Sequence, residues 1–168
     1  MTSEDACLEV FRDEFDYIFR TLQRLGTAPS QADDLVQEVF IALRRSWSEY
    51  DRQRPLRPYL FGIALRIVAA RRRNRKEAPF LGDSEDVEPS VDEAAEGPLL
   101  RTMVLNALQR LPLARRAVFV MHDLDDVPVA EAARVLGMRP FTAYWRLQKA
   151  RREFAVAIRR VIKEVDGG

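Results

Sequence analysis

Apolar side chains recur every three or four residues through most of this chain, which is the spacing of helices that bury one face. The pattern predicts an all-α fold made of two small helical domains. The predicted helices run from about Ala6 to Leu25, from Ser30 to Trp47, from Tyr59 to Lys76, from Pro98 to the break at Leu111-Pro112, through Val118 to Met121, and as a helix pair from Val127 to about Lys163.

Local start and stop signals lie between these helices. Gly26 ends the first helix, and Ser30 is the expected N-cap of the second, with Asp33 and Asp34 in its first turn. Residues 50–58 are a predicted loop because they contain two prolines.

Helical spacing disappears between residues 77 and 97. This segment contains eight acidic residues and no basic residue, with scattered proline and glycine. Such a composition favours an extended, poorly ordered linker. The sequence therefore predicts domains at residues 1–76 and 98–168, joined by an acidic flexible linker at residues 77–97.

The segment from Val127 to Phe154 predicts a helix-turn-helix. Ala130, Ala132, Ala133 and Leu136 give its first helix a small apolar face. Gly137 closes that helix because glycine accepts a left-handed conformation. Pro140 suits the first position of the next helix, where a missing N–H breaks no hydrogen bond. The small face lets the second helix cross the first closely, as this motif requires.

The second helix of this pair turns basic and aromatic groups away from its buried stripe. It holds five basic residues and no acid between Arg139 and Arg152. A solvated amphipathic helix explains the charge, but it does not explain Tyr144 and Trp145 on the same face. The combination favours contact with phosphates and base edges in a DNA major groove. The candidate DNA-binding residues are Arg139, Phe141, Thr142, Tyr144, Trp145, Arg146, Gln148, Lys149 and Arg152.

The net charge of +1 conceals a strong partition along the chain. Residues 1–76 have a net charge of +3, residues 77–97 of −8 and residues 98–168 of +6. Interaction with a helix C-terminus explains two or three of the basic groups at the end of the third helix, but not all six. A second nucleic-acid surface explains them better. It comprises Arg66, Arg71, Arg72, Arg73, Arg75 and Lys76.

The residue content argues against several kinds of chemistry. Cys7 is the only cysteine and His122 the only histidine, so an internal disulfide is impossible and a zinc site or a Cys/His nucleophile is nearly excluded. We expect His122 at a helix end, as a surface or capping residue. We predict no catalytic residue, no metal and no cofactor. Nothing resembles a membrane-spanning helix or a signal peptide, so we expect a cytoplasmic protein.

One face of the second helix is not needed for the predicted core. Ile41 lies there among the polar side chains of Asp34, Gln37 and Glu38. A lone exposed isoleucine is common, but this one could form the apolar centre of a docking surface.

Two motifs resemble the extracytoplasmic-function (ECF) group of bacterial RNA polymerase sigma factors. Conserved region 2 of that family is similar to DDLVQEVFIALRRSW followed by PLRPYLFGIALRIVAARRRNRK. Region 4 is similar to ALQRLPLARRAVFVMHDLDDVPVAEAARVLGMRPFTAYWRLQKAR. The order of the motifs, with no bulky domain between them, fits the ECF group better than the larger housekeeping sigma factors.

The resemblance implies a factor that binds core RNA polymerase and directs promoter recognition and transcription initiation. By similarity, the face of Asp34, Gln37, Glu38 and Ile41 binds the β′ clamp helices, and the β flap holds region 4. The third helix and the loop before it melt and capture the −10 element, and the helix from Phe141 reads the −35 element. The linker threads toward the active-centre and RNA-exit channels. An anti-sigma factor is a further candidate partner.

Three features depart from the family's usual pattern and bear on which promoter is read. Arg66 stands where the −10 reading loop often has Asn. Tyr144 and Trp145 occupy positions that are often basic and small, and Pro140 is unusual at its position.

Other classes of function compete with this interpretation. A DNA-binding regulator that works without polymerase has no use for the outward face of the second helix or for the acidic linker. A sigma-like mimic that sequesters an anti-sigma factor carries an additional receiver domain in known cases, for which this chain has no room. An enzyme is the least favoured, because the sequence contains no paired carboxylates, metal cluster or phosphate-binding glycine loop.

Overall fold

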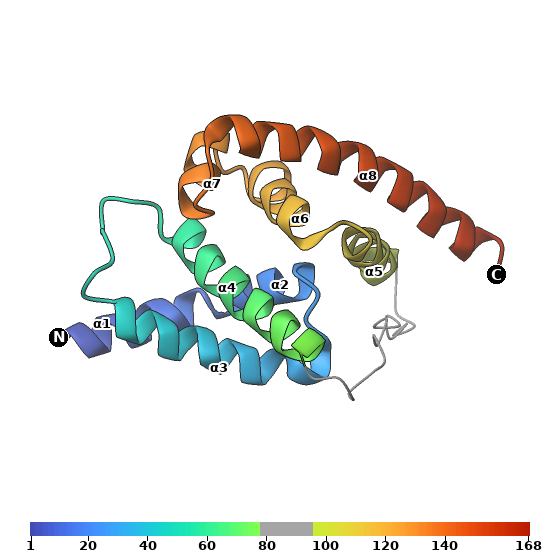
Figure 1. Cartoon of the computed structure of the whole chain (residues 1–168). Helices are drawn as coiled ribbons and strands as arrows, with labels where there is room; N and C mark the ends of the chain where they lie inside the picture. The colour runs from blue at the N-terminus through green and yellow to red at the C-terminus, as the bar shows by residue number, and fades with distance from the viewer. Residues whose placement is uncertain (78–95) are drawn as a thin grey trace.

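The computed structural model describes the backbone of residues 1–77 and 96–168 and the side chains of residues 1–75 and 99–168. Every regular element in these ranges is helical (Figure 1), which confirms the predicted all-α class. The elements are α1 (Ser3–Asp13), α2 (Phe15–Arg24), α3 (Pro29–Ser46), α4 (Leu56–Glu77), α5 (Glu96–Gln109), α6 (Leu113–Phe119), the π-helical turn η1 (Val120–Leu124), α7 (Val129–Val135) and α8 (Pro140–Asp166). The predicted linker lies outside the described residues, apart from its ends in α4 and α5.

The first predicted helix is wrong in one respect, because it is two helices that meet at Glu14. A capping box starts α1, in which Thr2 and Asp5 each accept a hydrogen bond from the other's backbone N–H. The Glu14 carboxylate binds Arg57 at 2.8 Å, and the turn there brings α1 onto α3. This long-range contact stabilises a break that helical spacing alone does not show. Helical spacing predicts that Phe15 is buried together with Phe11, Ile18, Leu22 and Leu25. The same turn instead leaves Phe15 exposed.

Two helix starts also differ from the prediction because prolines fit better than expected. Pro29 occupies the first turn of α3 and Ala28 is its N-cap, so Ser30 does not cap the helix and the acidic pair at residues 33–34 falls beyond the first turn. In α4, Pro58 lies within the first turn, where no backbone N–H is required, and the helix starts at Leu56 inside the predicted loop. Similarly, α5 starts two residues before Pro98.

The predicted helix-turn-helix is confirmed in α7 and α8. Gly137 has a φ of 67°, and the N–H of Met138 donates to the Ala133 carbonyl at 2.9 Å, which closes α7. Pro140 begins α8 as expected. The small face of α7 is formed by Ala132 and Ala133, whereas Ala130, which we assigned to it, is exposed.

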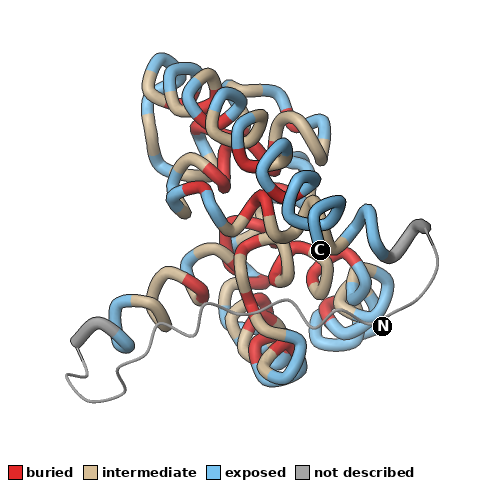
Figure 2. Tube along the Cα trace, turned by 90° about the vertical axis from the view of Figure 1, so that its right-hand side faces the viewer, coloured by how far each residue is buried: buried red, intermediate tan, exposed pale blue. Residues whose placement is uncertain are grey.

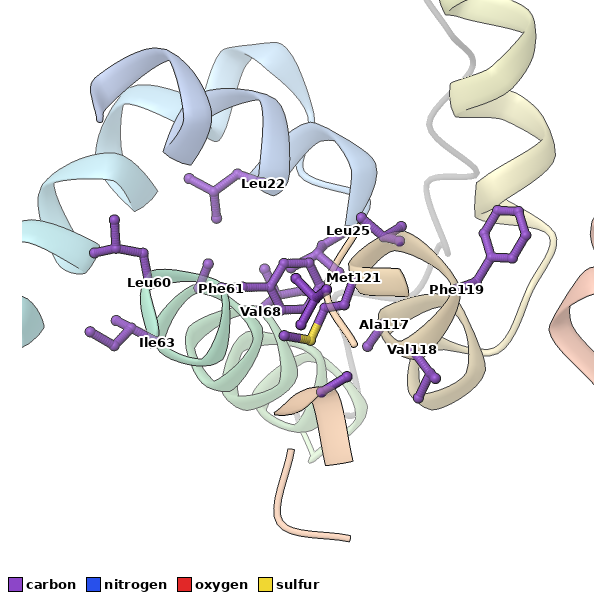
Figure 3. Close-up of a cluster of buried hydrophobic side chains, with 14 of the residues drawn as sticks. Leu22, Leu25, Leu60, Phe61, Ile63, Val68, Ala117, Val118, Phe119 and Met121 are labelled. Carbon is purple, nitrogen blue, oxygen red and sulfur yellow. The ribbon is translucent and has the colours of Figure 1, made fainter. Parts of the chain in front are cut away.

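The N-terminal half (α1–α4) and the C-terminal half (α5–α8) pack against each other (Figure 1), with α7 beside α4 and α5 beside α2. Buried residues run through the middle of the molecule (Figure 2), in one cluster that both halves share. Figure 3 shows Phe61 of α4 within it, together with Leu25 of the first half and Met121 of the second. Helical spacing in α4 predicts an inward stripe that does not include Phe61 and comprises Tyr59, Leu60, Ile63, Ala64, Ile67 and Val68. Phe61 is buried because the C-terminal half covers that side of the helix.

Candidate nucleic-acid interface

The first turns of α8 present a continuous outward face opposite the buried Ala143, Leu147 and Ala150. Its large side chains are well exposed: Phe141 to 81%, Tyr144 to 56% and Trp145 to 50%. We call this side of the helix the reading face. It comprises Phe141, Tyr144, Trp145, Gln148, Lys149 and Arg152.

Some polar groups of α8 are held in place before any partner arrives. The Lys149 ammonium lies 4.6 Å from the centroid of the Trp145 ring, a cation–π contact that ties the two side chains together. Arg146 is half-buried, and its guanidinium lies 3.9 Å from the sulfur of Met138 in the preceding turn. The orientations of these basic groups are therefore partly fixed.

The arginines along the flank of α8 differ in whether they have an acidic partner. Arg151 makes two 2.8 Å contacts with Asp123, and this pairing holds the pKa of the Asp123 carboxyl below its usual value and raises the pKa of Arg151. Arg139 and Arg152 have no side-chain partner among the described residues. These two exposed arginines are available to phosphates, whereas Arg151 is engaged.

The start of α8 also suits an anion. Arg139 is its N-cap residue and makes no side-chain capping bond. The N–H groups of Phe141 and Thr142 therefore have no intrahelical acceptor, and the helix dipole places partial positive charge there. A DNA phosphate is a natural partner for such a helix start.

The predicted basic surface on α4 divides in the structure. Arg66 and Arg73 are exposed, and Arg75 donates to the Gln31 amide oxygen at 2.8 Å. Arg71 forms an ion pair with Glu38 of α3. Arg72 turns inward to the Leu25 carbonyl at 3.4 Å, and burial lowers its pKa. The side chain of Lys76 lies outside the described residues.

The predicted docking face on α3 is present at the surface. Ile41 is 49% exposed, Asp34 and Gln37 are also exposed, and Glu38 is half-buried. The pair between Glu38 and Arg71 joins this face to the basic end of α4. Sequence reasoning missed the pair because 33 residues separate its members.

A second missed feature is the contact between the halves at the C-terminal end of α2. Arg116 is only 2% exposed and donates to the carbonyls of Leu25 and Leu111, both at 2.8 Å. The Gln109 amide donates to the Arg24 carbonyl at 3.3 Å. Side chains of the C-terminal half thus satisfy carbonyls that α2 leaves free. Burial lowers the pKa of Arg116 to about 9, which leaves it charged near neutral pH.

Gly26 makes this close approach between the halves feasible. Its φ is 103°, a conformation that favours glycine. A Cβ atom at this position would lie 2.5 Å from the Gln109 side-chain oxygen and 3.1 Å from an Arg116 nitrogen. The backbone conformation at Gly26 therefore favours glycine, and an added Cβ would displace the Gln109 side chain from its hydrogen bond with Arg116.

The other side of the contact between the halves is ionic. Arg24 binds Asp125 at 3.0 Å, and burial raises the pKa of Asp125 against the opposing effect of Arg24. The Tyr17 hydroxyl donates to the Arg57 carbonyl at 3.1 Å and lies 3.4 Å from the Asp125 carboxylate. Burial raises the pKa of Tyr17. This network borders a cavity of about 460 Å³ between the halves.

His122 is half-buried, and its Nδ1 lies 2.8 Å from the Val127 carbonyl. Residues 1–77 and 96–168 contain no group of three or more His, Cys, Asp or Glu side chains placed to hold a metal ion. No helix within these ranges is long and apolar enough to cross a membrane.

Two family models and several relatives match this chain. Residues 10–77 match the family model for sigma-70 region 2, and residues 101–154 match that for sigma-70 region 4. The ECF RNA polymerase sigma factor SigM of Mycobacterium tuberculosis is 30% identical over 152 residues, which cover 86% of this chain and 76% of SigM. The RNA polymerase sigma factor NccH of Alcaligenes xylosoxydans xylosoxydans is 29% identical over 134 residues, which cover 75% of this chain and 72% of NccH.

Solved structures share the fold. CnrH in complex with the cytosolic domain of CnrY has a TM-score of 0.68 at 21% identity, covering 94% of this chain and 90% of CnrH. The sigma factor RpoE in complex with the anti-sigma factor NepR from Bartonella quintana has a TM-score of 0.68 at 18% identity, covering 90% of this chain and 98% of RpoE. Regions 2 and 4 are thus matched in sequence and in fold, and the chain belongs to the ECF group of the sigma-70 family of RNA polymerase sigma factors.

Proposed function

We propose that this ECF sigma factor reads its promoter through two separate surfaces, with the basic side of α4 at the −10 element and the reading face of α8 at the −35 element. As a member of its family, the chain binds core RNA polymerase and promoter DNA and directs transcription initiation. In our assignment, residues 1–76 carry region 2 and residues 98–168 carry region 4. The acidic linker between them enters the polymerase channels.

The observation that carries the −35 assignment is the composition of the reading face of α8. Aromatic and basic side chains lie together on it without a carboxylate, next to a helix start that is free to bind phosphate. DNA offers partners for all of these groups, because it presents phosphates along its edge and base edges within the groove. The exposed Arg66 and Arg73 support the corresponding role of α4.

Binding of polymerase is assigned to the α3 face and to region 4. An apolar side chain surrounded by polar groups, as at Ile41, is typical of the centre of a docking surface. The β′ clamp helices are the proposed partner of this face, and the β flap is that of region 4. Catalysis of RNA synthesis then belongs to the core enzyme and not to this chain, which acts in the cytoplasm.

An anti-sigma factor is also part of the proposal. The solved structures of CnrH and RpoE are both complexes with partner proteins, and the partner of RpoE is an anti-sigma factor. Such a partner would compete with polymerase for the same chain.

Transcription from a promoter library tests the proposed function. Core polymerase with this chain should initiate on templates randomised at both elements and enrich two sequence blocks at a fixed spacing, whereas core polymerase alone should enrich none. A tight, sequence-specific gel shift by the isolated chain, together with no enrichment by the holoenzyme, would instead identify a regulator that works without polymerase.

A further inference from the structure

Phe141 is the most exposed of the large apolar side chains on α8. It is the second residue of α8, and it is 81% exposed although it is fully apolar. Trp145 lies one helical turn further along on the same side, because residues four apart on a helix are neighbours. Two large aromatic groups at the start of a helix thus face outward, where no described part of the chain covers them.

The polar groups around these aromatic side chains are largely engaged. The Lys149 ammonium lies against the Trp145 ring, the Arg146 guanidinium faces Met138, and Arg151 is paired with Asp123. The surface that α8 presents first is therefore apolar. Of the two unpaired arginines, Arg139 precedes the helix at the N-cap position, and Arg152 lies about three turns beyond Phe141.

The major groove of DNA contains an apolar group that this surface can contact. The N-terminal residues of a recognition helix contact the base edges. Each base pair presents hydrogen-bonding groups in the major groove, and the apolar group that distinguishes thymine there is its C5 methyl, which phenylalanine can contact.

We infer that Phe141 and Trp145 recognise thymine methyl groups in the upstream promoter element. The inference rests on the proposed function, in which α8 enters the major groove at that element. Selection of the upstream element then depends on contacts with 5-methylpyrimidines, and Trp145 holds Lys149 in place. Phe141 is the primary reader because it is more exposed than Trp145 and, within the described part of the chain, makes no cation–π contact.

Deoxyuridine substitution tests the inference without changing base pairing. The preferred upstream element is first selected from the library, and each thymine in it is then replaced singly by deoxyuridine, which lacks only the methyl group. Holoenzyme affinity should fall about fourfold at one or two positions, which corresponds to the transfer of one methyl group from water. The Phe141→Ala holoenzyme should bind the deoxyuridine template and the unmodified template with equal affinity, because it has no side chain left to contact the methyl group.

Two further variants complete the design. Phe141→Leu retains an apolar contact and should remain sensitive to deoxyuridine. Val156→Ala removes an exposed apolar side chain that lies fifteen residues, or about 22 Å, beyond Phe141 on the same helix, and its sensitivity should equal that of the parent. Since Phe141 is so exposed, each variant should unfold at the parent temperature.

The outcomes separate the inference from the function on which it rests. An equal loss with deoxyuridine in the parent and in Phe141→Ala would overturn the inference, because another residue would then read the methyl. An element that tolerates deoxyuridine at every position would also overturn it, while the proposed function would stand. A holoenzyme that selects no upstream element at all would overturn both.

Discussion

Ile41 is the one large apolar side chain of α3 that is exposed. We expect Ile41→Arg to weaken the binding of core polymerase by about tenfold or more, because a charge at the centre of an apolar contact removes a hot spot of binding. The thermal midpoint should barely change, since surface substitutions alter stability by about 0.5 kcal/mol or less. Titration of labelled chain with core enzyme measures the first effect, and thermal unfolding measures the second.

Phe15→Arg is the matched control for this substitution. Phe15 is 39% exposed, against 49% for Ile41, but it lies at the start of α2, outside the assigned docking face and outside region 4. Its affinity for core polymerase should equal that of the parent. Equal weakening by both substitutions would show that added positive charge, and not the α3 face, determines the result.

Gly26 provides a prediction about stability. We expect Gly26→Ala to lower the free energy of unfolding by about 2–3 kcal/mol, because it combines a left-handed backbone with a clash against Gln109. Gly137→Ala is the control: its φ is also positive, but no atom lies within 4 Å of the added Cβ. It should cost only about 1 kcal/mol. Urea titrations measure both, and equal costs would rule out a close contact between the halves at Gly26.

Within the helix α8, we expect some side chains to determine the preferred DNA sequence and others only to bind phosphates. Lys149→Ala should change the preferred base at one position of the upstream element, at a cost of about 1–3 kcal/mol. Arg139→Ala should weaken all sequences alike and reduce the salt dependence of binding by about one phosphate contact. Library transcription gives the first result and salt titration the second. Identical sequence preferences in the parent and in Lys149→Ala would show that this residue is not a reader.

Helices were predictable from the sequence where short-range signals determine them. The turn before α8 follows from Gly137 and Pro140, whose backbone preferences act within a few residues. The break at Glu14 was missed, because its stabilising partner Arg57 lies 43 residues away. The burial of Phe61 was missed for the same kind of reason, since the helices that cover it come from the other half of the chain.

The candidate sites follow the same division. The reading face of α8 was predictable, because a single helical period places its side chains together. The inward turn of Arg72 and the pairing of Arg71 were not, since a run of arginines in sequence says nothing of which carbonyl or carboxylate each one meets. The burial of Arg116 was not predictable either, since the Leu25 carbonyl that it meets lies 91 residues away.

For the whole molecule, the packed halves cannot account for promoter binding as they stand. Elements named −10 and −35 lie about 25 base pairs apart, or about 85 Å along the duplex. A compact chain of this length has a radius of gyration of about 15 Å, and hence a diameter of about 40 Å. The two halves must therefore separate before both elements are bound.

A disulfide between the halves tests this separation. A Cβ added at Gly62 lies 3.0 Å from the Val135 Cγ1, which is about the distance from a Cβ to the far sulfur in a disulfide. The double variant Gly62→Cys and Val135→Cys should lose at least about tenfold in promoter-directed transcription when oxidised and recover it with a reductant. Each single variant serves as a control. Full activity of the oxidised, cross-linked chain would show that the halves do not need to part.

The ion pair between Glu38 and Arg71 has a consequence for the order in which partners bind. In the proposed arrangement, polymerase that engages Glu38 on α3 would release a cation at the basic end of α4, so that the first partner would prepare the chain for the second. Thermodynamic coupling is reciprocal, so promoter DNA that takes up Arg71 must favour polymerase by the same factor. Because the pair is partly exposed, this coupling is worth at most about 1 kcal/mol, or roughly fivefold. A single charge pair thus makes assembly slightly cooperative in either order.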